Sequence, residues 1–157
     1  LSSIISSQKT QDARRKMNKY DLGGALGKGQ WGTVYRGKRK SDSLEVAVKR
    51  VRSADEVEGV NFQVIREIKM LRGVVHKHVV RLLDVVPEMD GLCMIFELMA
   101  TDLEKVLYES SRVVSEAVAK GFAAMMLDGL CFLASHFAFH RDIKPANLLI
   151  SHEGVLK

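Results

Sequence analysis

The residues best suited to chemistry lie near the end of the sequence, between His140 and Ile150. Asp142 and Asn147 stand five positions apart, and Pro145 between them prevents a simple helix. A carboxylate can accept the proton of a substrate hydroxyl, an amide oxygen can hold Mg²⁺, and Lys144 can neutralise a phosphoryl group in transfer. The stretch therefore favours phosphoryl-transfer chemistry.

A glycine-rich stretch near the N-terminus is a candidate for phosphate binding. Residues 27–34 are Gly-Lys-Gly-Gln-Trp-Gly-Thr-Val, the pattern G-x-G-x-x-G-x-V. The following residues alternate like a strand and no acid stands about 20 residues on, which argues against a dinucleotide fold. The Walker pattern is absent. A hairpin whose glycines let backbone N–H groups approach a triphosphate fits better, and a coincidental glycine turn stays open as the alternative.

A lysine in a strand pattern and a glutamate in a helix pattern form a further candidate pair. Ala47 and Lys49 face the same way because strand side chains alternate, so Ala47 leaves room for a flat base while Lys49 meets phosphate oxygens. Glu67 follows 18 residues later and can pair with Lys49; at 4 Å the gross attraction is about 4 kcal/mol, enough to position the lysine. The alternatives are a surface lysine on an edge strand and a glutamate on a solvated helix face.

The elements that position these residues follow from hydrophobic patterning. Short β-branched runs predict strands near 20–27, 32–39, 44–51, 79–86 and 92–98. Val60, Val64, Ile68 and Leu71 have helical spacing. After residue 100 the pattern is helical, so a mostly-strand half precedes a mostly-helical half, with the join near 99–102. This order predicts an α+β fold for residues 20–157, preceded by a flexible extension over residues 1–19.

Two helices are expected in the second half. Asp102 can cap a short helix and Ser115 can cap a longer one. The longer helix carries one apolar stripe, which is expected to be core. Its members are Val118, Phe122, Met125, Met126, Leu130 and Leu133.

Composition excludes several protein classes. With 157 residues, 46% hydrophobic and 27% charged, the sequence has the length of one domain and can bury a core, which excludes wholesale disorder. Cys93 and Cys131 are too few for a disulfide framework or a zinc ribbon and suit a reducing compartment.

No run approaches roughly 18 uncharged apolar residues, so a soluble protein is expected. The net charge of +5 permits an anionic ligand. For residues 1–19, rich in Ser and Arg, a transit peptide stays open as an alternative.

Taken together and in order, these motifs resemble the protein kinase family from Tyr20 to Lys157. The resemblance implies a bilobal fold, with an N-lobe of antiparallel sheet plus one helix over 20–98 and the first part of a mainly helical C-lobe over 99–157. It implies ATP and Mg²⁺ as cofactors, Asp142 as catalytic base, Asn147 as metal ligand, and Lys49 on the phosphates with Glu67 as its partner. Lys144, where tyrosine kinases carry Ala-Ala-Arg, implies transfer to serine or threonine.

The same resemblance implies a set of nucleotide-binding residues. Residues 26–34 would cover the nucleotide, Phe96 would be the gatekeeper of the hinge, the backbone of Glu97 and Met99 would meet adenine, and Leu149 would lie beneath the base. The whole set is Leu26, Gly27, Lys28, Gly29, Gln30, Trp31, Gly32, Thr33, Val34, Ala47, Lys49, Phe96, Glu97, Met99 and Leu149.

Further stretches are similar to the cyclin-dependent kinase group. Residues 58–68 are similar to the cyclin-docking helix, and Thr101-Asp102-Leu103 to that group's hinge exit. Gln30 and Trp31 stand where cell-cycle members often carry an inhibitory Thr-Tyr, which points to the CDK-activating kinase associated with transcription factor TFIIH. This resemblance implies a cyclin-type partner on the 58–68 helix, protein substrates with Ser or Thr, a nuclear or cytoplasmic location, and no direct nucleic acid or membrane partner.

One departure from the family pattern leaves an alternative open. The sequence stops at Lys157 without the Asp-Phe-Gly motif that supplies the second metal ligand, so we expect a fragment of a longer kinase. The alternative is a truncated or pseudokinase-like module that binds nucleotide or cyclin without catalysis. A nucleic-acid binder is a more distant alternative, because the basic residues are scattered.

Overall fold

The computed structural model describes residues 17–29, 32–52, 62–88, 91–108 and 114–157. The chain divides into two compact units. The first reaches to Leu71 and resumes over Leu82–Leu98, and the second comprises Arg72–Arg81 and Met99–Lys157.

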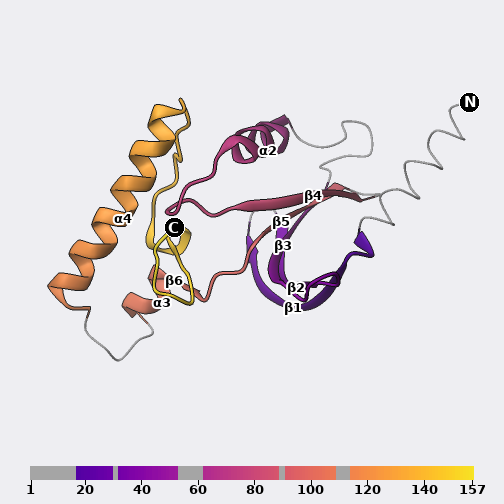
Figure 1. Ribbon diagram of the computed structural model, residues 1–157, viewed down its shortest axis with the longest axis horizontal. Coiled ribbons are helices and arrows are strands. Elements are labelled where there is room, and N and C mark those ends of the chain that lie inside the picture. Colours follow the sequence, from indigo (N-terminus) through magenta and orange to yellow (C-terminus); the bar gives the residue numbers. More distant parts are fainter. Residues whose placement is uncertain (1–16, 30–31, 53–61, 89–90, 109–113) are drawn as a thin grey trace, which may run out of the picture. The chain divides into compact units, whose positions relative to one another are not determined.

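The first unit is built on an antiparallel sheet of five strands with the order β1-β2-β3-β5-β4 (Figure 1). The strands are β1 (Tyr20–Gly29), β2 (Gly32–Arg39), β3 (Glu45–Arg52), β4 (Leu82–Glu88) and β5 (Gly91–Glu97). Their positions confirm four of the five predicted strands; the predicted start of the fourth at residue 79 is wrong. The backbone N–H of Val79 donates to the carbonyl of His76 at 3.2 Å, and this turn keeps residues 79–81 out of the sheet.

Alternating side chains give this sheet an apolar core on each face, as the pleat requires. One core holds Tyr20, Val46, Val48, Val86, Cys93 and Ile95. The other face is covered by helix α2 (Phe62–Gly73), whose Val64 and Ile68 pack against Val51, Leu92 and Met94. Lys49 has the same parity as Val51, so its side chain lies on the face that α2 covers. Val60, expected to begin this helix, lies outside the described residues.

The second unit contains two α-helices, and both predicted caps are confirmed. Helix α3 (Leu103–Tyr108) follows the short strand β6 (Thr101–Asp102), and Asp102 Oδ1 accepts the Lys105 N–H at 2.9 Å. Helix α4 (Glu116–Ser135) begins after Ser115, whose Oγ accepts the Val118 N–H at 3.4 Å. A 3₁₀ turn, η1 (Pro145–Asn147), leads into β7 (Leu149–Ile150), which pairs with β6.

The apolar stripe of α4 is less buried than the sequence predicted. Leu133 is buried, whereas Val118 is 47% exposed and the other four members are half-buried. An apolar cavity of about 210 Å³ lies between α3 and α4, and Phe122 and Met126 line it. The expectation of core along this stripe is therefore wrong for Val118, and Phe122 and Met126 are only partly covered where they line the cavity.

Helix α4 also has the length and apolar composition that would allow it to cross a membrane. It carries Lys120 and Asp128, and Asp128 pairs with Lys77 at 3.0 Å. Apolar helices of this length also occur in soluble domains, so this one helix does not establish a membrane span.

Candidate active site

The loop that carries Asp142 is held together by hydrogen bonds among its own residues. Asn147 Nδ2 donates to Asp142 Oδ2 at 2.8 Å and to the Asp142 carbonyl at 2.9 Å, and Lys144 Nζ lies 2.9 Å from Asp142 Oδ2. Pro145 begins η1 because its fixed φ suits the first position of a helical turn, and this turn brings Asn147 back to Asp142. The structure thus groups Asp142, Lys144 and Asn147, the three residues that the sequence proposed for this loop.

Asp142 is exposed and ionised. The hydrogen bond from Lys144, followed by that from Asn147, holds the pKa of Asp142 below its ordinary value of 3.8. Preceding it, Arg141 has a φ of 65°, a conformation that non-glycine residues rarely adopt and that is concentrated at functional sites. A carboxylate that is charged at neutral pH can accept a proton from a hydroxyl group, and the two donors fix its orientation.

Asn147 is oriented for a second role. Its amide nitrogen donates both hydrogen bonds to Asp142, so its amide oxygen is the atom of this side chain that could ligate a cation. Amide and carboxylate oxygens are the donors that Mg²⁺ prefers, so this donor set fits the ion. Asn147 is the residue of the described loop that would hold it.

The Lys49–Glu67 pair belongs to the first unit. Lys49 on β3 and Glu67 on α2 lie 3.0 Å apart through Nζ and Oε1, and the lysine side chain is 24% exposed. Packing of Val64 and Ile68 on the sheet turns this face of α2 toward β3. The helix thereby fixes the position of the Lys49 ammonium, as the 18-residue spacing suggested.

The glycine-rich stretch forms the β1–β2 hairpin of the first unit. Gly27 pairs with Val34, Lys28 with Thr33, and Gly29 with Gly32. Gly32 has a φ of +137°, and a Cβ there would lie 2.0 Å from the Arg50 carbonyl oxygen, so this position requires glycine. Leu26 is exposed on β1, while Gln30 and Trp31 lie outside the described residues.

The residues proposed to contact adenine are divided between the units. Ala47 on β3 and Phe96 on β5 are cross-strand partners, on the same face as Lys49 and Met94. Glu97 ends β5. Met99 and Leu149 belong to the second unit, where Leu149 lies on β7, directly after the Asp142 loop.

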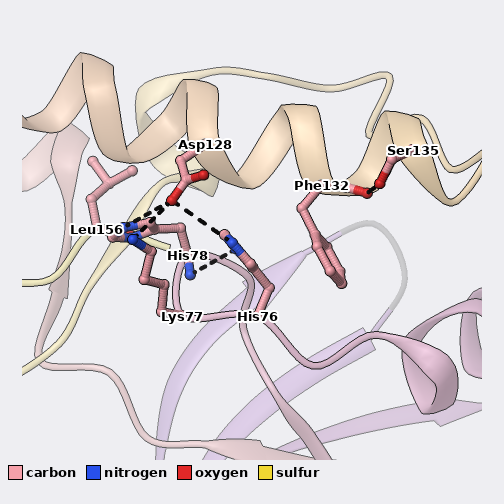
Figure 2. Close-up of polar contacts among 7 residues, drawn as sticks. All are labelled: His76, Lys77, His78, Asp128, Phe132, Ser135 and Leu156. Carbon is pink, nitrogen blue, oxygen red and sulfur yellow. Dashed lines mark hydrogen bonds and ion pairs between the residues drawn. The ribbon is translucent and has the colours of Figure 1, made fainter.

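One polar cluster of the second unit was not singled out from the sequence. Figure 2 shows His76, Lys77 and His78 directed at Asp128 of α4. The pattern His-Lys-His directly after a predicted helix was visible, but its partner stands 50 residues later. Only the fold brings the two together.

Comparison with known proteins identifies the family. A model of the protein kinase domain matches residues 20–157. Cyclin-dependent kinase D-1 of Oryza sativa subsp. indica is 38% identical over 144 residues, which cover 92% of this chain and 34% of the relative. Cyclin-dependent kinase D-1 of Arabidopsis thaliana is 39% identical over 132 residues, covering 84% and 33%.

A vertebrate relative gives the same result. Cyclin-dependent kinase 7 of Xenopus laevis is 36% identical over 149 residues, which cover 93% of this chain and 42% of the relative. The chain thus spans about a third to two fifths of the length of these relatives. With the family model matching from β1 to the last residue, and with the sheet, α2 and the Asp142 loop in the order the motifs predicted, this chain belongs to the protein kinase family.

Proposed function

We propose that this chain supplies the nucleotide-binding lobe and the catalytic loop of a serine/threonine kinase of the cyclin-dependent type. The reaction is transfer of the γ-phosphoryl group of Mg-ATP to a protein Ser or Thr. The observation that carries the proposal is the grouping of Asp142, Lys144 and Asn147, with an ionised carboxylate held by two donors.

Each of the proposed site residues has a defined task in this reaction. Asp142 accepts the proton of the substrate hydroxyl as the hydroxyl oxygen attacks the γ-phosphorus, the bond from that phosphorus to the β,γ-bridging oxygen breaks and ADP leaves, while Lys144 offsets charge on the transferring group. Lys49, held by Glu67, binds phosphate oxygens and fixes the nucleotide. Asn147 would hold Mg²⁺ through its amide oxygen, and the bound ion would neutralise charge on the phosphate oxygens. The residues mainly position the reactants and offset charge, which is what a loose phosphoryl transition state requires.

A cyclin-type subunit is the proposed regulator, with residues 58–68 as its docking segment. The three relatives named above bear cyclin-dependent kinase names, and α2, which includes residues 62–68 of this segment, carries Glu67; residues 58–61 lie outside the described residues. A partner that shifts α2 changes the distance from Glu67 to Lys49, so docking would control the lysine. We propose the nucleus or cytoplasm as the location, which agrees with Cys93 and Cys131 forming no disulfide.

The test uses the full-length protein with and without a cyclin-type subunit. Asp142→Asn should lower kcat by roughly 100- to 10,000-fold, the usual contribution of a general base, and should leave the Kd of Mg-ATP within about twofold because Asp142 acts on the hydroxyl. Asp42→Asn is the matched control, since Asp42 is an exposed carboxylate paired with Arg39 in the β2–β3 turn. Equal turnover of the wild type and the Asp142 variant would refute the assignment. A wild type that binds Mg-ATP but transfers nothing would instead support a non-catalytic binding module.

A further inference from the structure

Three segments that are distant in sequence meet at the imidazole of His78, all within the second unit. His78 Nδ1 lies 2.8 Å from the Leu156 carbonyl oxygen, and its Nε2 lies 3.8 Å from Asp128 Oδ2 of α4 (Figure 2). The His78 side chain is only 9% exposed. The ring therefore links the segment Arg72–Arg81 to α4 and to the end of the described chain.

The contacts fix where the protons of both histidines lie. A carbonyl oxygen only accepts hydrogen bonds, so His78 Nδ1 carries the proton it donates to Leu156. The backbone N–H of His78 donates to His76 Nδ1 at 3.2 Å, so the neutral His76 ring carries its proton on Nε2 and presents an N–H toward Asp128. His76 thus offers Asp128 no lone pair for a shared metal ion, and no group of three metal ligands is found among the described residues. The cluster of His76, Lys77, His78 and Asp128 is therefore a polar anchor that holds this segment on α4, and the name anchor is used for it below.

The anchor is held on α4 by contacts that do not involve Leu156. Lys77 Nζ lies 3.0 Å from Asp128 Oδ2 and lowers the pKa of that carboxyl, and the His76 ring stacks on Phe132 at 4.5 Å between centroids. A Cβ at Gly129 would lie 2.5 Å from the His78 carbonyl oxygen, so the close approach needs the glycine. His78 is therefore a donor in a fixed place.

Leu156 carries this restraint to the catalytic loop. Its side chain is 1% exposed, and its residue bridges to Ile150 of β7. The next residue, Lys157, exchanges two backbone hydrogen bonds with Leu149, at 2.9 and 2.8 Å. Leu149 stands two positions after Asn147, which donates to Asp142. A short chain of contacts inside one unit thus connects the His78 ring to the proposed base.

We propose that His78 is a positioning residue for the Asp142 loop, acting through the Leu156 carbonyl; the proposal rests on the phosphoryl-transfer function proposed above. The chemistry predicts which replacement preserves the role. The amide nitrogen of asparagine stands two bonds beyond Cβ, as Nδ1 of histidine does, and can make the same donation. Glutamine places its amide one bond further out and alanine has no donor, so both lose it.

The first experiment measures kcat and the KM for ATP in the full-length protein with its cyclin-type subunit. His78→Gln and His78→Ala should lower kcat by about five- to tenfold, which corresponds to one lost hydrogen bond, while His78→Asn stays within about twofold of the wild type. The KM for ATP should change less than about twofold in all three, because Lys49 and the glycine hairpin are untouched. His152→Ala is the control, since His152 is exposed in the turn before Leu156.

The second experiment measures backbone hydrogen exchange at Leu149 and Lys157 in the same full-length variants, a readout that does not need activity. Exchange should rise about five- to tenfold in His78→Gln and return toward the wild-type rate in His78→Asn. The proposal is overturned if the Gln and Asn variants behave alike in kcat and exchange, or if neither differs from the wild type. If the wild-type protein transfers no phosphoryl group, the proposed function fails, and exchange alone decides whether His78 holds this strand.

Discussion

The two charged groups proposed for catalysis, one in each unit, are built in opposite ways. Lys49 and Glu67 come from a strand and a helix 18 residues apart, and one contact of 3.0 Å joins them. Asp142, Lys144 and Asn147 come from six consecutive positions and share several contacts, although Asp142 is 62% exposed. One group depends on tertiary packing, and the other is made by a local turn.

Because of this difference, a regulator can switch the Lys49–Glu67 contact, whereas the Asp142 loop is preformed. The Asp142 loop is shaped by Pro145 and its own hydrogen bonds, and its further contacts lie within the second unit, so it does not depend on the seating of α2. The Lys49–Glu67 contact exists only where α2 is seated on the sheet. A regulator that moves α2 would act on the lysine and leave the base in place. Four variants test this contrast.

Asn147→Ala should break the local group. It removes the two hydrogen bonds that Asn147 donates to Asp142, together with the amide oxygen proposed for Mg²⁺, so kcat of the full-length kinase should fall by about 100-fold or more. Lys49 and Glu67 should keep their contact. Asn18→Ala, at an exposed position before β1, is the matched control. A variant with wild-type kcat would show that the loop does not depend on Asn147.

Ile68→Ala should break the long-range pair through packing. Ile68 is buried between α2 and the sheet, and its truncation should cost about 2–5 kcal/mol of unfolding free energy in a urea titration. Hydrogen exchange should rise along α2 and stay unchanged at residues 142–147. Ile65→Ala, at a 37% exposed position of the same helix, should cost much less. Equal losses at the two positions would contradict the assigned packing.

Glu67→Gln tests the pair without disturbing the core. The neutral amide keeps the shape but loses the charge that holds Lys49, so kcat/KM for ATP should fall about tenfold, the value of one charge-assisted hydrogen bond. The melting temperature should hardly change, because both side chains are partly exposed. Glu116→Gln in the surface pair with Lys120 is the control and should leave kcat/KM unchanged.

Lys144→Met should change the titration of Asp142. The lysine hydrogen bond is the main cause of the lowered pKa, so the pKa of Asp142 should rise toward 3.8 in the variant. The carboxylate's stabilising contacts are fully present above the unfolded value and are lost as the pH falls through the folded pKa. The variant should therefore lose them at a higher pH than the wild type. Side-chain carboxyl NMR measures the shift, and Lys120→Met should leave Asp142 unchanged.

The parts of the fold that the sequence predicted are those with local causes. The first three strands and β5, the two helix caps and the join of the two halves follow from alternation, capping residues and composition. The start of β4 was misplaced because the Val79–His76 turn interrupts an apolar run that has the pattern of a strand. Val118 was expected in the core because its spacing fits the stripe, but spacing does not tell what covers a helix.

The candidate site shows the same limit. The sequence grouped Asp142, Lys144 and Asn147 because they lie within six positions, and it suggested the Lys49–Glu67 pair through strand parity and the family pattern. The contact of His78 with Leu156 spans 78 positions and involves a backbone carbonyl. No side-chain type marks a carbonyl acceptor in a sequence, so this contact required coordinates.

Gly129, which has no side chain, gives a criterion that can be applied to the sequences of homologues. A methyl group there cannot coexist with the present path of the His78 backbone. In a homologue with alanine or a larger residue at this position, the segment equivalent to residue 78 must lie further from the helix. A short side-chain donor such as His or Asn would then not reach its acceptor. Homologues can thus be divided by whether they carry glycine at the position equivalent to 129. In those that do, an Asn or His is expected at the equivalent of residue 78.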